Sequence, residues 1–180
     1  MCIRDRAAYK RYFGPEAPFY SMFDVGDYTF APYKVVWQSF GVSRMMVAVG
    51  AEFEAKPVMT NQAMHIFIPL YSASEAHYVC ALMNSAAFEF AVISHTQKGG
   101  KSFAQSSILR AIRIPKFDPA NKLHQELASL SQQAHEAQAA GEEEGLKEIE
   151  HRIDELAAQI WGLTREELKE IRDSLEELQS

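Results

Sequence analysis

Residues 12–40 restrict the fold more than any other part of the chain, because they combine dense aromatic side chains with frequent glycine and proline. The stretch holds ten of the 20 aromatic residues. Gly14-Pro15, Gly26 and Pro32 interrupt it at short intervals, and proline inside a helix removes a backbone hydrogen bond and clashes with the preceding turn. A long helix is therefore excluded here, and we expect short strands joined by irregular links.

Runs of β-branched and aromatic residues predict the strands of this part of the chain. They are Tyr33–Gln38 (YKVVWQ), Met45–Val49 (MMVAV) and His65–Leu70 (HIFIPL), with a turn at Gly41–Ser43. Alternation along the first strand places Trp37 on the same face as Val35 and Lys34 on the opposite face. We predict that Trp37 is buried and that most of the aromatic cluster is core, with stacking on a flipped or unpaired base as the alternative.

The apolar period becomes helical from Ser72 to Ile93, where Ser72 and Glu75 fit a capping box. Asn84-Ser85 within this run is interpreted as a local structural element. A polar loop, Ser94–Ser107, follows the helix, and Ile108–Ile114 is predicted to return as a strand closed by a proline. These elements complete a β-rich unit with a central helix over residues 7–119.

From Leu123 the chain reads as helix throughout. Two apolar stripes are separated by Gly141–Gly145 (GEEEG), Gly162 is a natural stop, and Thr164 with Glu167 forms a capping box that opens a last helix. We therefore predict an antiparallel helical hairpin and a short terminal helix over residues 120–180. The predicted fold class is α+β.

Charge is divided unequally between these two parts. Residues 1–119 hold 12 Lys and Arg against 9 Asp and Glu, whereas residues 120–180 hold 6 against 15, within a formal net charge of −6. The stretch from Ser94 to Lys116 holds five basic residues and no acidic one. Such clustering points to a polyanionic partner, since lysine, arginine and backbone amides supply most phosphate contacts to nucleic acid.

The candidate DNA contacts lie mainly in the loop and the strand predicted after it. They are Lys98, Gly99, Gly100, Lys101, Ser102 and Gln105 in the loop, Arg110 and Arg113 on the strand, and Lys34 on the first strand. Glycine lets the backbone approach a phosphate closely, and Gln105 could read adenine by two hydrogen bonds. A flexible solvated loop and a solvated arginine pair are the alternatives. On an ideal strand Arg110 and Arg113 would point to opposite faces, with Arg113 outward.

Four segments in order resemble one protein family. They are Phe19–Trp37 (FYSMFDVGDYTFAPYKVVW), Lys56–Leu70 (KPVMTNQAMHIFIPL), Ala76–Ser85 (AHYVCALMNS) and the KGGKSF…LRAIRIPKF run, and Asp154–Ile171 (DELAAQIWGLTREELKEI) adds the usual ending. Together they resemble the C-terminal target-recognition (specificity) region of adenine-specific (N6) DNA methyltransferases of restriction–modification and phage-defence systems. The resemblance covers nearly all of residues 9–175.

The resemblance implies a parent enzyme that flips adenine out of the duplex and methylates it with S-adenosylmethionine. The chain has no Asn-Pro-Pro-Tyr or Asp-Pro-Pro-Tyr motif, and Gly99-Gly100 does not lie in a strand-to-helix turn for a cofactor. We therefore expect a sequence-specific DNA-recognition module without catalytic residues or a cofactor of its own. Its expected partners are double-stranded DNA and a methyltransferase region missing from this chain. Met1–Arg6 (MCIRDR) resembles a translated sequencing adapter and is left out of the fold prediction.

A protein-interaction scaffold acting through the helical hairpin is the alternative function, and the hairpin could also simply stabilise its own domain. Cys80 is interpreted as a small buried hydrophobe, which favours the cytoplasm. No apolar run predicts a membrane span, and the histidines show no ligand spacing for a metal. His124, His135 and Glu142–Glu144 are interpreted as solvated helix surface.

Overall fold

The computed structural model describes residues 12–14, 16–18, 25–38, 44–59, 65–96 and 109–179. The elements in chain order are the 3-10 helix η2 (Asp27–Phe30), β1 (Tyr33–Gln38), β2 (Val47–Gly50), β3 (His65–Leu70), α1 (Ala73–Asn84), α2 (Ala86–Ser94), α4 (Lys122–Ala140), α5 (Glu143–Trp161) and α6 (Arg165–Gln179). The predicted α+β class is confirmed. Met1–Arg6 and the predicted turn at Gly41–Ser43 lie outside the described residues.

The strands form one antiparallel sheet in the order β2-β1-β3. Val35 on the central strand pairs with Val49 on one side and Ile68 on the other. The predicted bounds of β1 and β3 are confirmed, and β2 begins two residues later than predicted. Trp37 is buried at 3% exposure, as predicted from strand alternation.

The predicted single helical run from Ser72 to Ile93 is two helices joined at Ser85. Ser85 has extended backbone angles (φ −72°, ψ 150°), donates its hydroxyl to the Leu82 carbonyl and accepts from the Phe88 amide. At this break α1 and α2 are bent by 61°. The N-terminal cap is confirmed, because Ser72 Oγ accepts from the Glu75 amide. Among the described residues no single helix is long and apolar enough to cross a membrane, although the bent pair α1–α2 meets the criterion by length and composition.

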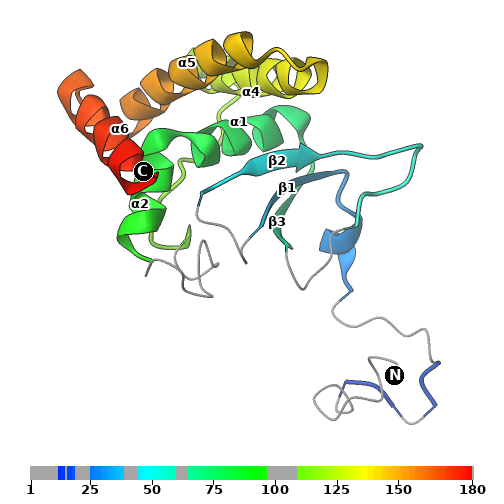
Figure 1. Ribbon diagram of the computed structural model, residues 1–180. Coiled ribbons are helices and arrows are strands. Elements are labelled where there is room, and N and C mark those ends of the chain that lie inside the picture. Colours follow the sequence, from blue (N-terminus) through cyan, green and yellow to red (C-terminus); the bar gives the residue numbers. More distant parts are fainter. Residues whose placement is uncertain are drawn as a thin grey trace.

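Helix α1 lies between the sheet and the C-terminal helices, so the molecule has three layers (Figure 1). One face of α1, including Ala76, Cys80 and Met83, packs on Val35 and Trp37 of the sheet. Its other face contributes Tyr78, Ala81 and Leu82 to a second core with α4 and α5. A helix covered on two sides needs apolar residues around most of its circumference, and this explains the continuous apolar run from Tyr78 to Met83 in α1.

The C-terminal residues form three helices, as predicted. Gly141 (φ 74°) ends α4 and Gly162 (φ 70°) ends α5, both in the left-handed conformation that glycine adopts without strain. Thr164 and Glu167 form the predicted capping box at the start of α6. Because the second core joins this part to α1, the described residues of the β-rich unit and of the helical hairpin pack together.

Candidate nucleic-acid interface

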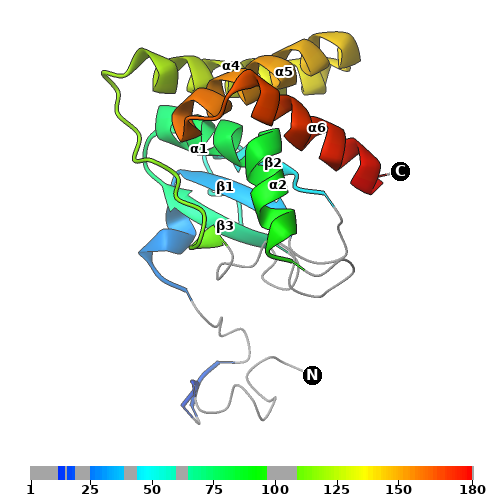
Figure 2. The same cartoon turned by 90° about the vertical axis from the view of Figure 1, so that its left-hand side faces the viewer.

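The glycine loop that we predict to contact DNA lies outside the described residues. This applies to Lys98, Gly99, Gly100, Lys101, Ser102 and Gln105. The described part of the candidate interface is the stretch that follows, residues 109–118, which leads along the flank of the molecule to the start of α4 (Figure 2).

Residues 109–117 separate apolar and basic side chains. Leu109 and Ile112 pack against the core between the sheet and α1, Ile114 contacts both cores, and Phe117 packs against the core between α1 and the hairpin. The basic side chains of the same stretch are exposed, and we call them the basic row: Arg110, Arg113 and Lys116. No described carboxylate forms an ion pair with any of the three. Their charge is therefore free of partners within the described structure.

The predicted strand at Ile108–Ile114 is wrong for its described residues. Leu109 to Ile112 form a turn in which the Ile112 amide donates to the Leu109 carbonyl, and the chain then continues without regular structure. The turn replaces the two-residue alternation of a strand. Arg110 and Arg113 are consequently both exposed, although an ideal strand would have placed them on opposite faces.

Side chains from three helices bond the irregular backbone beneath the basic row. The Trp161 indole of α5 donates to the Arg113 carbonyl at 3.0 Å, and the Tyr78 hydroxyl of α1 donates to the Pro115 carbonyl at 3.2 Å. Burial raises the pKa of Tyr78 to about 12, so its hydroxyl keeps the proton that this bond requires. These contacts satisfy carbonyls that no strand or helix serves.

His124 of α4 makes the third contact with this backbone. It is only 6% exposed, and its Nδ1 accepts from the Asp118 amide at 3.0 Å. Because Nδ1 accepts, a neutral ring carries its proton on Nε2, which lies 3.5 Å from the Tyr78 hydroxyl. His124, interpreted from sequence as solvated helix surface, is therefore an interior group. Glu142–Glu144 are exposed, as predicted.

Lys34 is in the interior and not on a DNA-binding surface. Its side chain is 2% exposed, its Nζ donates to the Ala31 carbonyl at 2.8 Å, and it lies 5.9 Å from the Phe67 ring centroid. Burial lowers the pKa of the Lys34 ammonium. Lys34 lies on the face of β1 opposite Trp37, which we predicted to contact DNA. Instead, its ammonium is bonded to Ala31, in the chain just before β1.

The second histidine on α4, His135, is also not solvated surface. Its Nε2 accepts from the Val49 amide at 3.0 Å and its Nδ1 lies 2.7 Å from the Ser131 carbonyl, so Nδ1 carries the proton. Nearby, the Asn84 carboxamide accepts from the Val47 amide at 2.9 Å and donates to the Val47 carbonyl at 2.8 Å. These side chains bond the outer edge of β2. Asn84 therefore has a structural role, but its partner is a strand 37 residues away and not a local group.

The described residues hold no group of three metal-binding side chains. Cys80 is fully buried, with a thiol whose pKa burial raises to about 12, so it is a poor nucleophile. Of the aromatic cluster, Tyr28 and Phe30 are exposed on η2, while Trp37 is core. Phe19, Tyr20, Phe23 and Phe40 lie outside the described residues.

Sequence reasoning found the basic row but missed the groups that hold it. Trp161 is 48 residues from Arg113 along the chain, and Tyr78 is 37 residues from Pro115. Both side chains pack among core residues. The polar atom of each was the available signal, because a buried tyrosine or tryptophan generally finds a hydrogen-bond partner. That rule predicts a partner but does not identify it.

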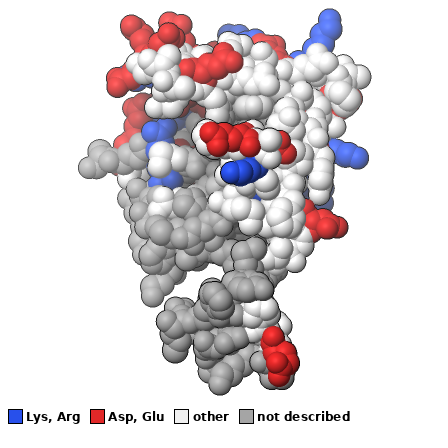
Figure 3. Space-filling model, turned by 90° about the vertical axis from the view of Figure 1, so that its right-hand side faces the viewer, with Lys and Arg blue, Asp and Glu red and all other residues white. Residues whose placement is uncertain are grey.

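Acidic side chains gather over the upper part of the face shown in Figure 3. This agrees with the excess of 15 acidic over 6 basic residues in residues 120–180.

Comparison of the chain with known protein families, with curated protein sequences and with solved structures finds no match.

Proposed function

We propose that this chain is a DNA-recognition module, the target-recognition part of an adenine-specific DNA methyltransferase or of a fused restriction–methylation enzyme. The observation that supports this most is the basic row: three exposed cations on a backbone bonded to three helices, without an acidic partner among the described residues. Phosphate contacts of this kind fix the register of a protein on a duplex.

In the proposed mechanism the basic row and the lysines of the preceding loop, Lys98 and Lys101, bind the phosphates of double-stranded DNA. The loop side chains then discriminate bases, with Gln105 matched to adenine by its paired donor and acceptor. Methyl transfer from S-adenosylmethionine belongs to the methyltransferase region of the parent polypeptide. The module's own contribution is to place the target adenine before that region acts.

The scaffold alternative, in which the helical hairpin is the working surface, is less well supported. The apolar residues Leu127, Ile153 and Leu156 of the hairpin are buried against α1. An apolar stripe already used inside the molecule is not free to bind a partner protein. The packing instead supports the reading in which the hairpin stabilises its own domain.

Charge reversal tests the proposal. Arg110→Glu with Arg113→Glu is compared with Lys147→Glu with Lys169→Glu, an equal charge change at exposed positions of α5 and α6. Binding of a labelled duplex is followed by fluorescence anisotropy across a salt titration. We expect the first variant to bind weakly, with a salt slope smaller by about 2 because two phosphate contacts are lost, and the second to bind like wild type.

Lys98→Glu with Lys101→Glu is expected to abolish binding in the same assay, with unchanged thermal unfolding. If the Arg110→Glu, Arg113→Glu variant bound DNA as well as the Lys147→Glu, Lys169→Glu variant, the basic row would be excluded as the DNA contact. Failure of the wild-type chain to bind duplex DNA at low salt would exclude the function itself.

A further inference from the structure

Residues 113–118 belong to neither a helix nor a strand, so regular structure supplies no partners for their peptide groups. Contacts from Trp161, Tyr78 and His124 fill this need at three points, the backbone of Arg113, Pro115 and Asp118. Their side chains come from α5, α1 and α4. The geometry of the basic row is therefore set by helices that do not carry it.

Trp161 lies at the end of a helix and packs against both cores. It is the last residue of α5, directly before Gly162, whose left-handed backbone (φ 70°) ends the helix. Its ring packs against both cores, with the Phe88 ring centroid 6.4 Å away. An indole has one donor and no acceptor, and here that donor is used on the Arg113 carbonyl. A fixed ring with a single donor fixes the peptide that it bonds.

We infer that the helical hairpin positions the basic row for DNA, with Trp161 as the positioning residue that holds Arg113 without itself contacting DNA. Residues 120–180, which hold the hairpin and α6, carry 15 acidic against 6 basic residues and are unsuited to lie on DNA themselves. The hairpin can still raise the affinity for DNA without contacting it, because a backbone that is ordered before binding has less conformational freedom to lose on binding. This inference rests on the proposed function.

The test uses the full chain, a labelled duplex of mixed sequence and low salt. Trp161→Phe removes the indole donor and keeps an aromatic ring in the same site, and Tyr78→Phe removes the donor to Pro115 from a different helix. We expect each to weaken DNA binding about fivefold, the effect of losing one hydrogen bond. Arg152→Ala is the matched control, because Arg152 bridges α4 and α5 at the surface without contacting residues 113–118.

A double-mutant cycle separates positioning from general loosening. If Trp161 acts through Arg113, the fivefold loss caused by Trp161→Phe disappears in an Arg113→Gln background. An equal loss in both backgrounds would overturn the inference, because the tryptophan would then act on the whole fold. Should Trp161→Phe unfold at the assay temperature, the same cycle is run with Tyr78→Phe and Lys116→Gln.

The outcomes for the two proposals are distinct. A wild-type chain that does not bind duplex DNA overturns the proposed function. If the wild-type chain binds DNA and Arg113→Gln weakens binding, but Trp161→Phe has no effect, the proposed function stands and the positioning role of Trp161 is overturned.

Discussion

Helix side chains bond the backbone of non-helical parts of the molecule in two places, which we call joints, and similar side chains have different roles in each. In the strand joint, Asn84 and His135 bond the outer edge of β2. In the segment joint, Tyr78, His124 and Trp161 bond the irregular backbone of residues 113–118. The first covers an edge that could otherwise pair with another strand. The second holds a segment whose own charges stay exposed.

The two histidines of α4 show the difference most clearly. His135 has its proton on Nδ1 and accepts at Nε2, whereas His124 accepts at Nδ1, so that in its neutral form the proton is on Nε2. They are 11 residues apart, about three helical turns, and therefore on the same face of α4. The backbone groups next to each ring therefore decide which nitrogen carries the proton. The same face of α4 contributes a histidine to each joint.

The largest effect is expected from a substitution that breaks both joints together. Leu127 is fully buried in the core that α1 shares with α4 and α5. Leu127→Ala should lower the free energy of unfolding by about 3 kcal/mol, through lost burial and the cavity left behind. Urea unfolding measures the loss. A change below about 1 kcal/mol would show that α4 is not held to α1 through this core.

Lowering the pH should destabilise the region of the strand joint. His77 of α1 lies beside it, with Nδ1 3.1 Å from Ser131 Oγ and its ring 5.1 Å from that of His135. Burial, with a smaller contribution from the His135 charge, lowers the pKa of His77 from 6.5 to about 4. The unfolded chain therefore binds more protons in this range, and stability falls as the pH drops from about 6.5 to 4.

The size of this loss is on the order of 2 kcal/mol, since the partial exposure of the ring reduces the full linkage value. Thermal unfolding followed across this pH range measures it, with His77→Gln as the control that lacks the titrating group. The variant should show a shallower decline than wild type. Parallel curves would mean that another group causes the acid sensitivity.

Sequence reasoning predicted the elements whose signal is local. The strand Tyr33–Gln38, the stop at Gly162 and the Thr164–Glu167 capping box each depend on neighbouring residues, and all three are confirmed. Ile108–Ile114 also resembled a strand locally, yet its described residues form a turn and irregular chain, with the apolar side chains still inward. Strand alternation would have placed Arg110 on one face with Ile112 and Ile114, whereas Arg110 is exposed and Leu109 packs inward with the isoleucines. The apolar residues were correctly expected inside, but the local pattern did not show whether a neighbouring strand was available.

Polar groups in helices were predicted least well. His124 and His135 were assigned to the surface because they are polar, although they share a helix face with the buried Leu127 and Ser131. Their positions followed helical spacing, but their burial depended on backbone donors from β2 and from residue 118. Those donors are distant in sequence. Only the fold brings them together, so neither joint could be predicted from the chain alone.

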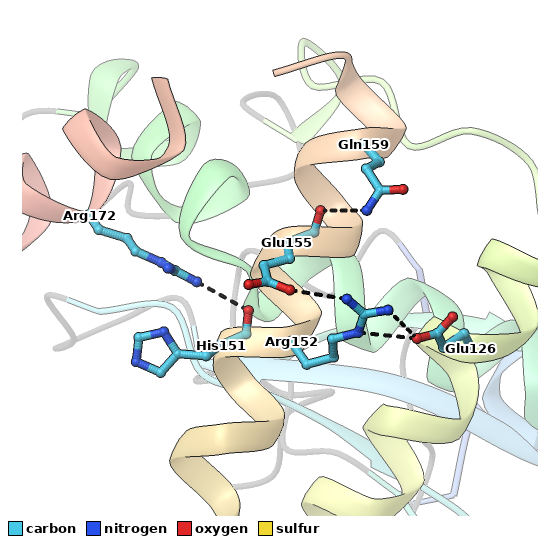
Figure 4. A network of polar contacts seen from close by, with 6 residues as sticks. All are labelled: Glu126, His151, Arg152, Glu155, Gln159 and Arg172. Atoms are coloured by element: carbon cyan, nitrogen blue, oxygen red, sulfur yellow. Dashed lines mark hydrogen bonds and ion pairs between the residues drawn. The ribbon is translucent and has the colours of Figure 1, made fainter. Parts of the chain in front are cut away.

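The smallest effect is expected where the hairpin is tied together away from both joints. Arg152 of α5 donates to Glu126 of α4 at 2.8 Å and to Glu155 at 3.1 Å (Figure 4), and all three side chains are about half exposed. Hydrogen bonds to these carboxylates raise the pKa of the guanidinium. Solvent nevertheless screens the network, so Arg152→Ala should lower stability by only about 0.5 kcal/mol, less in high salt. Urea unfolding at two salt concentrations measures this. If Arg152→Ala lowers the free energy of unfolding by more than roughly 2 kcal/mol, this surface network contributes more to holding α4 than expected. The two joints would then not be the main attachment of the helices.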